Sequence, residues 1–137
     1  MAVADAAYLA GIIDGEGTIG VYAYEHRAPA VHLSVANTDR ALLEWIATST
    51  GVGAVITRKV VNVDLHRQSY TWQCSSQAAG TTLRQVQPYL RVKASQAQLA
   101  LDLLDGLVVP ARKADSTWQM EIVDQVRQLN RRGPLSG

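Results

Sequence analysis

The spacing of apolar residues along the first half of the chain predicts a helix, a hairpin and a second helix. Apolar residues recur at helical spacing after Asp5, a candidate N-cap, until Gly15 and Gly17 stop the pattern. Apolar and polar residues then alternate, and we expect the apolar positions of both strands to face a core. The predicted elements are a helix over 5–17, a strand over 18–25, a turn over 26–29, a strand over 31–35 and a helix that is capped by Thr38 or Asp39 and ends before Gly51.

The second half of the chain repeats this order. β-Branched residues predict a strand over 52–63, a turn near Asp64 and a return strand through Tyr70, Trp72 and Cys74. Helical patterns follow over 77–87, where Pro88 ends the helix, over 95–106, where Gly106 ends it, and over 115–131. Two hairpins without parallel crossovers predict an α+β fold in the order αββαββα, with helices covering one face of an antiparallel sheet. We expect a single domain over 1–137, with a core over about 5–107 and a C-terminal helix over about 115–131.

Composition narrows the class of protein. The 137 residues are 47% hydrophobic and 18% charged, which excludes a disordered or fibrous chain. No apolar run approaches the roughly eighteen residues of a membrane span, and Asp5 stands where a signal peptide would carry a basic residue. The single cysteine, Cys74, excludes an intramolecular disulfide and a multi-cysteine zinc site. We therefore expect an intracellular protein, in the cytoplasm, nucleoid or an organelle, with no membrane partner.

Charge is unevenly distributed although its sum is only +1. Residues 1–50 hold two basic and six acidic side chains, whereas residues 51–93 hold six basic and one acidic. A basic middle beside an acidic start fits a phosphate-facing surface with carboxylates set apart for a metal. An ordinary solvated surface fits the same numbers equally well.

Polar and aromatic residues are predicted to gather on the sheet face that the helices leave free. Such side chains can hydrogen-bond to base edges, and a twisted β-ribbon can enter the major groove of DNA. A hydrated sheet face without a partner would show the same pattern. The third strand leaves open whether Arg58 or Lys59 faces a phosphate. The candidate DNA-binding residues are Thr18, Tyr22, Tyr24, His32, Ser34, Arg58, Ser69, Thr71 and Gln73.

The predicted first helix carries the nonapeptide Leu9-Ala10-Gly11-Ile12-Ile13-Asp14-Gly15-Glu16-Gly17. Ala7, Gly11 and Gly15 fall at i, i+4 and i+8, on a helix face almost without side chains that lets a second backbone approach. If two copies of this helix pair through that face, the Glu16 side chains of the two copies would lie close together near the axis between them. Two like charges at this distance are costly unless a cation separates them. Hard oxygen ligands suit Mg²⁺, and paired metals can assist cleavage of a phosphodiester. A solvated helix end is the alternative.

This nonapeptide resembles the signature of the LAGLIDADG homing endonucleases, with Ile for Leu, Gly for Ala and Glu for Asp. The segment 38–43 followed by Gly51-Val52-Gly53 resembles the second-helix region of that family, and the segment 88–93 followed by Gln96 resembles its basic motif. The resemblance extends from residue 8 to about residue 104. It implies a saddle-shaped antiparallel sheet and, because the chain carries one motif, a homodimer with a two-fold axis between the signature helices.

The resemblance also implies an activity and its residues. Glu16 would bind the metal with the Gly15 carbonyl, and Lys93, Arg40 and Asn37 would complete the catalytic set. The implied dimer interface comprises Ala7, Gly11, Asp14 and Gly15. The implied reaction is Mg²⁺-dependent cleavage of a long pseudo-palindromic double-stranded DNA site with 3′ overhangs, in the service of intron or intein mobility. Mn²⁺ is expected to substitute, and Ca²⁺ to support binding without cleavage. A non-catalytic DNA-binding regulator and a maturase that binds intron RNA are alternatives on the same fold.

Overall fold

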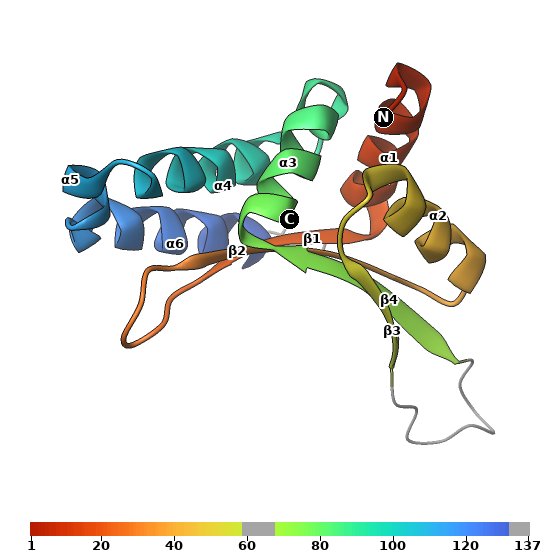
Figure 1. Ribbon diagram of the computed structural model, residues 1–137, viewed down its shortest axis with the longest axis horizontal. Coiled ribbons are helices and arrows are strands. Elements are labelled where there is room, and N and C mark those ends of the chain that lie inside the picture. Colours follow the sequence, from red (N-terminus) through yellow and green to blue (C-terminus); the bar gives the residue numbers. More distant parts are fainter. Residues whose placement is uncertain (59–67, 132–137) are drawn as a thin grey trace.

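The computed structural model describes residues 1–58 and 68–131 (Figure 1). The strands are β1 (Gly17–Tyr22), β2 (Ala30–Asn37), β3 (Ala54–Arg58) and β4 (Ser69–Ser75). The helices are α1 (Val3–Glu16), α2 (Arg40–Thr50), α3 (Ser76–Val86), the short 3₁₀ helix η1 (Gln87–Tyr89), α4 (Ala94–Leu107), α5 (Pro110–Lys113) and α6 (Ser116–Arg131). The expected strand over 52–63 is therefore described only as far as Arg58, and the expected turn near Asp64 lies outside the described residues.

The described strands form one antiparallel sheet in the order β1-β2-β4-β3. β1 pairs with β2 from Gly17 opposite Val35 to Tyr22 opposite Ala30. β2 also pairs with β4, so the two hairpins join at the centre of the sheet. The predicted α+β class and antiparallel sheet are confirmed.

The helices cover one face of this sheet, and the core lies between the two layers (Figure 1). Leu9 and Ile13 of α1 are fully buried against it, as are Leu33 of β2 and Trp72 of β4. The indole N–H of Trp72 donates to the backbone oxygen of Val52 at 3.0 Å, so its one polar atom is satisfied. Along β2 and β4 the apolar residues alternate with polar ones, which leaves the polar set on the opposite face.

Two local expectations are wrong, and one short helix was not predicted. The first helix begins at Val3, so Asp5 lies within its first turn and does not cap it. Gly106 does not end a helix: α4 continues to Leu107, and a Cβ at position 106 would lie 2.4 Å from the ring of Trp118. Close packing therefore explains this glycine. The short helix α5 that follows was not expected from the sequence.

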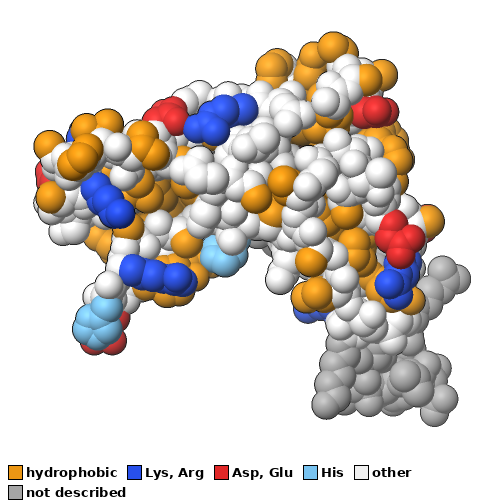
Figure 2. Space-filling model, viewed as in Figure 1, with side chains coloured by type: hydrophobic (Ala, Val, Ile, Leu, Met, Phe, Trp, Pro, Cys, Tyr) orange, Lys and Arg blue, Asp and Glu red, His pale blue; other side chains and the backbone are white. Residues whose placement is uncertain are grey.

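The uncovered face of the sheet forms the underside of an arch. In Figure 1 the β1–β2 hairpin and the β3–β4 strands descend on opposite sides, and Figure 2 shows the surface hollowed between them. Strong twist is the normal consequence of right-handed strand coiling in a small sheet. Among the described residues, no helix has the length and apolar character needed to cross a membrane.

Candidate active site and nucleic-acid interface

Glu16 is the last residue of α1, and a side chain from β2 holds its carboxylate. Because Gly17 lies opposite Val35, β2 extends two residues further, to Asn37, alongside the end of α1. The side-chain amide of Asn37 donates a hydrogen bond of 2.6 Å to Glu16 Oε2. Asn37 Oδ1 in turn accepts from the backbone N–H of Asp39 at 2.8 Å. The structure thus brings two of the predicted site residues into direct contact.

Lys93 reaches the same helix end from the loop before α4. Its ammonium donates to the backbone oxygen of Asp14 at 2.7 Å. In return, the Asp14 carboxylate accepts the backbone N–H groups of Arg91, Val92 and Lys93 at 2.8, 3.1 and 2.9 Å. Charge-assisted bonds of this kind are stronger than neutral ones, so this Asp14–Lys93 contact fixes the loop against α1.

The contacts of Asp14 lie within its own chain. The sequence predicts Asp14 at the dimer interface, and that place stays a prediction, while its carboxylate accepts from three backbone amides of the same chain. The same contact gives Lys93 a structural role, because a cation beside the last carbonyls of a helix is stabilising. An ammonium has three donors, so one bond to a carbonyl does not exhaust it. Lys93 bonds to the carbonyl of Asp14, the residue before Gly15, and Glu16 is the residue after it.

The donors at this helix end fit a hard divalent cation. A carboxylate from Glu16 and the carbonyl of Gly15 are oxygen ligands of the type that Mg²⁺ and Ca²⁺ take. Within residues 1–58 and 68–131, no three His, Cys, Asp or Glu side chains gather into a metal site.

The small-residue face of α1 is not used by the core of its own chain. Ala7, Gly11 and Gly15 are exposed, and a Cβ built at either glycine would meet no described atom within 4 Å outside the backbone of its own helix. Shallow hollows flank this face, one lined by Tyr8 of α1 and Leu42 of α2, the other by residues of η1. Figure 2 shows apolar side chains gathered over α1 and α2. This face of α1 thus carries no side chain beyond Cβ, and we call it the bare face. The hollow beside it is partly lined by apolar side chains.

Several predicted DNA-binding residues lie in rows across the free face of the sheet. Thr18, Ser34 and Gln73 are paired neighbours on β1, β2 and β4. Arg58 of β3 lies opposite Ser69 of β4, and directly paired residues share a face. Arg58 is therefore the third-strand cation on the free face among the described residues, and Lys59 lies outside them.

The free face also carries apolar residues that the sequence analysis did not select. Ile56 of β3 and Ala36 of β2 both lie opposite Thr71 of β4, and the side chain of Ile56 is 43% exposed. Apolar side chains can contact the methyl group of thymine in the major groove. An apolar position at a solvent-facing point of a strand is the signal that could have found Ile56.

At the β1–β2 hairpin, four side chains form a group that we call the hairpin cluster: Tyr22, Tyr24, Arg27 and His32. β1 ends at Tyr22, so the expected strand over 18–25 is too long and Tyr24 lies in the turn. The Tyr24 hydroxyl is 3.2 Å from His32 Nε2, and the Tyr22 and His32 rings meet edge to face at 5.2 Å. The guanidinium of Arg27 lies 3.9 Å from the centre of the Tyr24 ring. Arg27 is not among the DNA-binding residues that the sequence predicts.

Arg40 is the predicted site residue whose contacts lie apart from the others. It begins α2 beyond the cap Asp39, and its Nε donates to Glu44 at 2.8 Å in an exposed i,i+4 pair. Its guanidinium carbon is also 5.4 Å from the ring centre of Tyr70. Exposed pairs of this kind contribute about 0.5 kcal/mol. A catalytic role for Arg40 stays a prediction.

Cys74 is not a candidate nucleophile. Burial raises the pKa of its thiol to about 11, although a hydrogen bond with Thr82 lowers it in part. The thiol therefore stays protonated at neutral pH, and the thiolate is the reactive form.

Known proteins share this fold and sequence pattern. No protein-family model matches the chain. Among curated proteins it is similar to the DNA endonuclease I-CreI of Chlamydomonas reinhardtii, with 28% identity over 134 residues that cover 90% of this chain and 77% of that protein. Among solved structures it is similar to the homing endonuclease I-CvuI in complex with its target, with a TM-score of 0.73, 27% identity and coverage of 93% of this chain and 82% of that one.

A more distant structure shares the fold. The archaeal intron-encoded homing endonuclease I-Vdi141I complexed with DNA gives a TM-score of 0.70 at 18% identity, covering 93% of this chain and 82% of that one. The signature helix with its terminal carboxylate, the four-stranded antiparallel sheet and the resemblance to these relatives agree with one another. The chain has the fold of the LAGLIDADG homing endonucleases and is similar in sequence to single-motif members of that family.

Proposed function

We propose that this protein is a homodimeric, metal-dependent endonuclease that cuts both strands of a long pseudo-palindromic DNA site and leaves 3′ overhangs. The observation that carries the proposal is the position of Glu16. Its carboxylate is held by Asn37 at the end of a helix face that carries no side chain beyond Cβ, and β1 begins at the next residue. Lys93 bonds to the carbonyl of Asp14 at the same helix end.

The bare face of α1 supports the dimer. A helix face without side chains beyond Cβ lets two backbones approach closely, and a two-fold axis along Ala7, Gly11 and Gly15 would bring two Glu16 carboxylates together. The same axis would turn the two sheets into a continuous concave surface. Each half would then read one half of a pseudo-palindromic site.

The chemistry follows from these residues. Glu16 and the Gly15 carbonyl would hold a divalent cation, which stabilises charge on the oxygens of a phosphodiester under attack. Asn37 holds the orientation of the Glu16 carboxylate, and Lys93 places a positive charge beside the same helix end to stabilise negative charge on the phosphate. The residues of the free sheet face hold the DNA in register.

Solved structures of relatives support the use of divalent metals. I-CvuI was crystallised with its target in the presence of Ca²⁺, and with the I-CreI target in the presence of Mg²⁺, where the DNA was not cleaved. For this chain we propose Mg²⁺ as the catalytic ion, Mn²⁺ as a substitute and Ca²⁺ as an ion that supports binding only. We further propose that residues 1–137 form one domain, that the protein acts inside the cell, and that it serves intron or intein mobility.

The decisive test is a cleavage selection from a library of randomised palindromic DNA, run in parallel with Mg²⁺ and Ca²⁺. Recovery of one pseudo-palindromic site that is cut only with Mg²⁺ would support the proposal and define the half-site. Enrichment of a bound sequence without cutting in either metal would contradict it and favour a DNA-binding regulator. Selective binding of a structured RNA in place of DNA would favour a maturase.

A further inference from the structure

The hairpin cluster contains one cation that no predicted DNA-binding set includes. Arg27 lies in the turn between β1 and β2, and it is stacked on the ring of Tyr24 at 3.9 Å. Among residues 1–58 and 68–131 it makes no ion pair. The nearby carboxylate of Glu25 has its Oε2 at 3.9 Å from Nε2 of His26. An exposed arginine that is ordered by an aromatic ring and free of a carboxylate is placed for an external partner.

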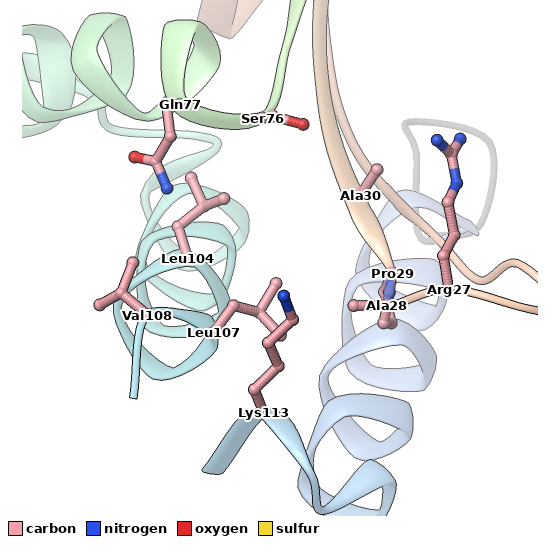
Figure 3. A pocket seen from close by; sticks show the side chains of 10 residues that line it. All are labelled: Arg27, Ala28, Pro29, Ala30, Ser76, Gln77, Leu104, Leu107, Val108 and Lys113. Carbon is pink, nitrogen blue, oxygen red and sulfur yellow. The ribbon is translucent and has the colours of Figure 1, made fainter. Parts of the chain in front are cut away.

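The contact of Tyr24 with β2 places this stack beside the free face of the sheet. The Tyr24 hydroxyl bonds with His32 Nε2 at 3.2 Å, and His32 lies opposite Gly20 within the paired part of the hairpin. Tyr24 is therefore turned back from the loop toward the sheet, and Arg27 follows it. In Figure 3, Arg27 lies at the edge of a hollow that Leu107 and Lys113 also line, and its guanidinium points away from these two residues.

Gly20 provides the floor of the cluster. A Cβ at this position would lie 2.5 Å from the hydroxyl oxygen of Tyr22, so the Tyr22 ring folds over a strand position that has no side chain. That ring meets His32 edge to face, at an interplanar angle of 64°. The absence of a side chain at position 20 thus determines where Tyr22 lies, and Tyr22 packs against the histidine that orients Tyr24.

The chemistry of a stacked guanidinium favours a guanine base. Stacking covers one face of the planar group and leaves its N–H edge free. Two parallel N–H donors match O6 and N7 of guanine in the major groove, which is the commonest specific contact of arginine with DNA. A side chain already ordered by packing also loses less conformational entropy when it binds.

We propose that Arg27 is a specificity-determining residue that reads a guanine at the outer end of each half-site, and that Tyr24, His32 and Tyr22 position it. The inference rests on the proposed function, because it requires the sheet to lie in the major groove of DNA. β1 rises about 3.3 Å per residue and duplex DNA about 3.4 Å per base pair. Because β1 begins at Gly17, directly after Glu16, the guanine lies roughly five or more base pairs outward from the metal site.

The test is selection of bound DNA from a randomised library in Ca²⁺, which needs no cleavage, with wild-type protein, Arg27→Ala and Arg112→Ala. Arg112 is a matched control because it also stacks on an aromatic ring, Trp118 at 4.3 Å, but in the helical layer. We expect wild type and Arg112→Ala to select guanine at one outer position of each half-site. Arg27→Ala is expected to lose that preference alone and to keep the rest of the site.

A base analogue sharpens the measurement. Substituting 7-deazaguanine at the selected position removes the N7 acceptor and is expected to weaken binding of wild type about 5- to 100-fold. Arg27→Ala is expected to bind both DNAs equally, and Arg27→Lys to lose the discrimination although it keeps the charge. Tyr24→Phe, which keeps the stack but removes the bond to His32, is expected to retain more discrimination than Tyr24→Leu.

Two results would overturn the role of Arg27. One is an equal loss of affinity for all sequences in Arg27→Ala, which would make it a phosphate contact. The other is a selected site that Arg27→Ala leaves unaltered. A wild-type protein that selects no DNA sequence at all would instead contradict the proposed function.

Discussion

Replacing Asp14 tests the contact that joins the signature helix to the loop carrying Lys93. Asp14→Ala removes the two carboxylate oxygens that accept three hydrogen bonds, at 2.8 to 3.1 Å, from the backbone N–H groups of residues 91–93. Asp14→Asn keeps Oδ1, which accepts from Val92 and Lys93, but turns an amide N–H₂ toward the N–H of Arg91. The two variants should therefore differ in a defined order.

The geometry sets the expected magnitudes. A net contribution of about 1 kcal/mol for each of three partly exposed hydrogen bonds predicts a loss of about 3 kcal/mol in the free energy of unfolding for Asp14→Ala. Asp14→Asn loses one bond and the charge that strengthens the other two, which predicts a loss of about 1–2 kcal/mol. Both losses are large fractions of the stability of a small domain.

Urea unfolding followed by circular dichroism measures these values, at one fixed protomer concentration because dimer stability depends on concentration. Asp124→Ala is a matched control, since its carboxylate is 63% exposed and lies 3.9 Å from Arg127. We expect it to fall within about 0.5 kcal/mol of wild type. Asp14→Ala unfolding at the same urea concentration as Asp124→Ala would refute the role of the Asp14–Lys93 contact.

Three further predictions concern the interface, catalysis and pH. Gly11→Leu should convert the dimer to a folded monomer by analytical ultracentrifugation, because a Cβ at Gly11 meets nothing in its own chain; an unchanged dimer mass would contradict the interface. Lys93→Met should slow cleavage about 100-fold or more at saturating DNA, and an equal loss of binding would indicate a structural role alone. The raised pKa of Cys74, about 11 against 9.0, means that the folded state holds its proton more tightly. The resulting stability is fully present below pH 9 and is lost as the pH rises toward 11, so a Cys74→Ala variant should show a shallower fall of stability over that range.

Local patterns in the sequence were enough to predict most of the fold. Alternation identified the buried residues of β2 and β4, and the signature motif identified α1. The alternation of apolar and polar residues continues through Tyr24, which made the predicted strand too long. β1 ends at Tyr22 because its pairing with β2 ends at Ala30. The end of a strand depends on its neighbour, which a one-dimensional pattern does not contain.

The site was predictable only where residues are near in sequence or belong to the motif. Glu16 and Lys93 were predicted in this way, and both lie at the end of α1. The bonding of Asp14 was not, because its partners lie 77 to 79 residues away and are backbone amides that any residue type supplies. Gly106 was read as a helix end, since nothing in the local sequence shows that Trp118 packs against it. Arg27 was missed because its significance comes from a stack with Tyr24 in a turn.

The measurement that tests the central claim most directly is cleavage of the selected DNA site by Glu16→Gln, with Glu121→Gln as control. Glu121 is an exposed carboxylate on α6 and is not one of the predicted site residues. The account predicts that Glu16→Gln binds DNA in Ca²⁺ within a few-fold of wild type and shows no single-turnover cleavage in Mg²⁺, while Glu121→Gln cuts normally. Cleavage by Glu16→Gln at the wild-type rate would contradict the assignment of the metal site to the end of the signature helix.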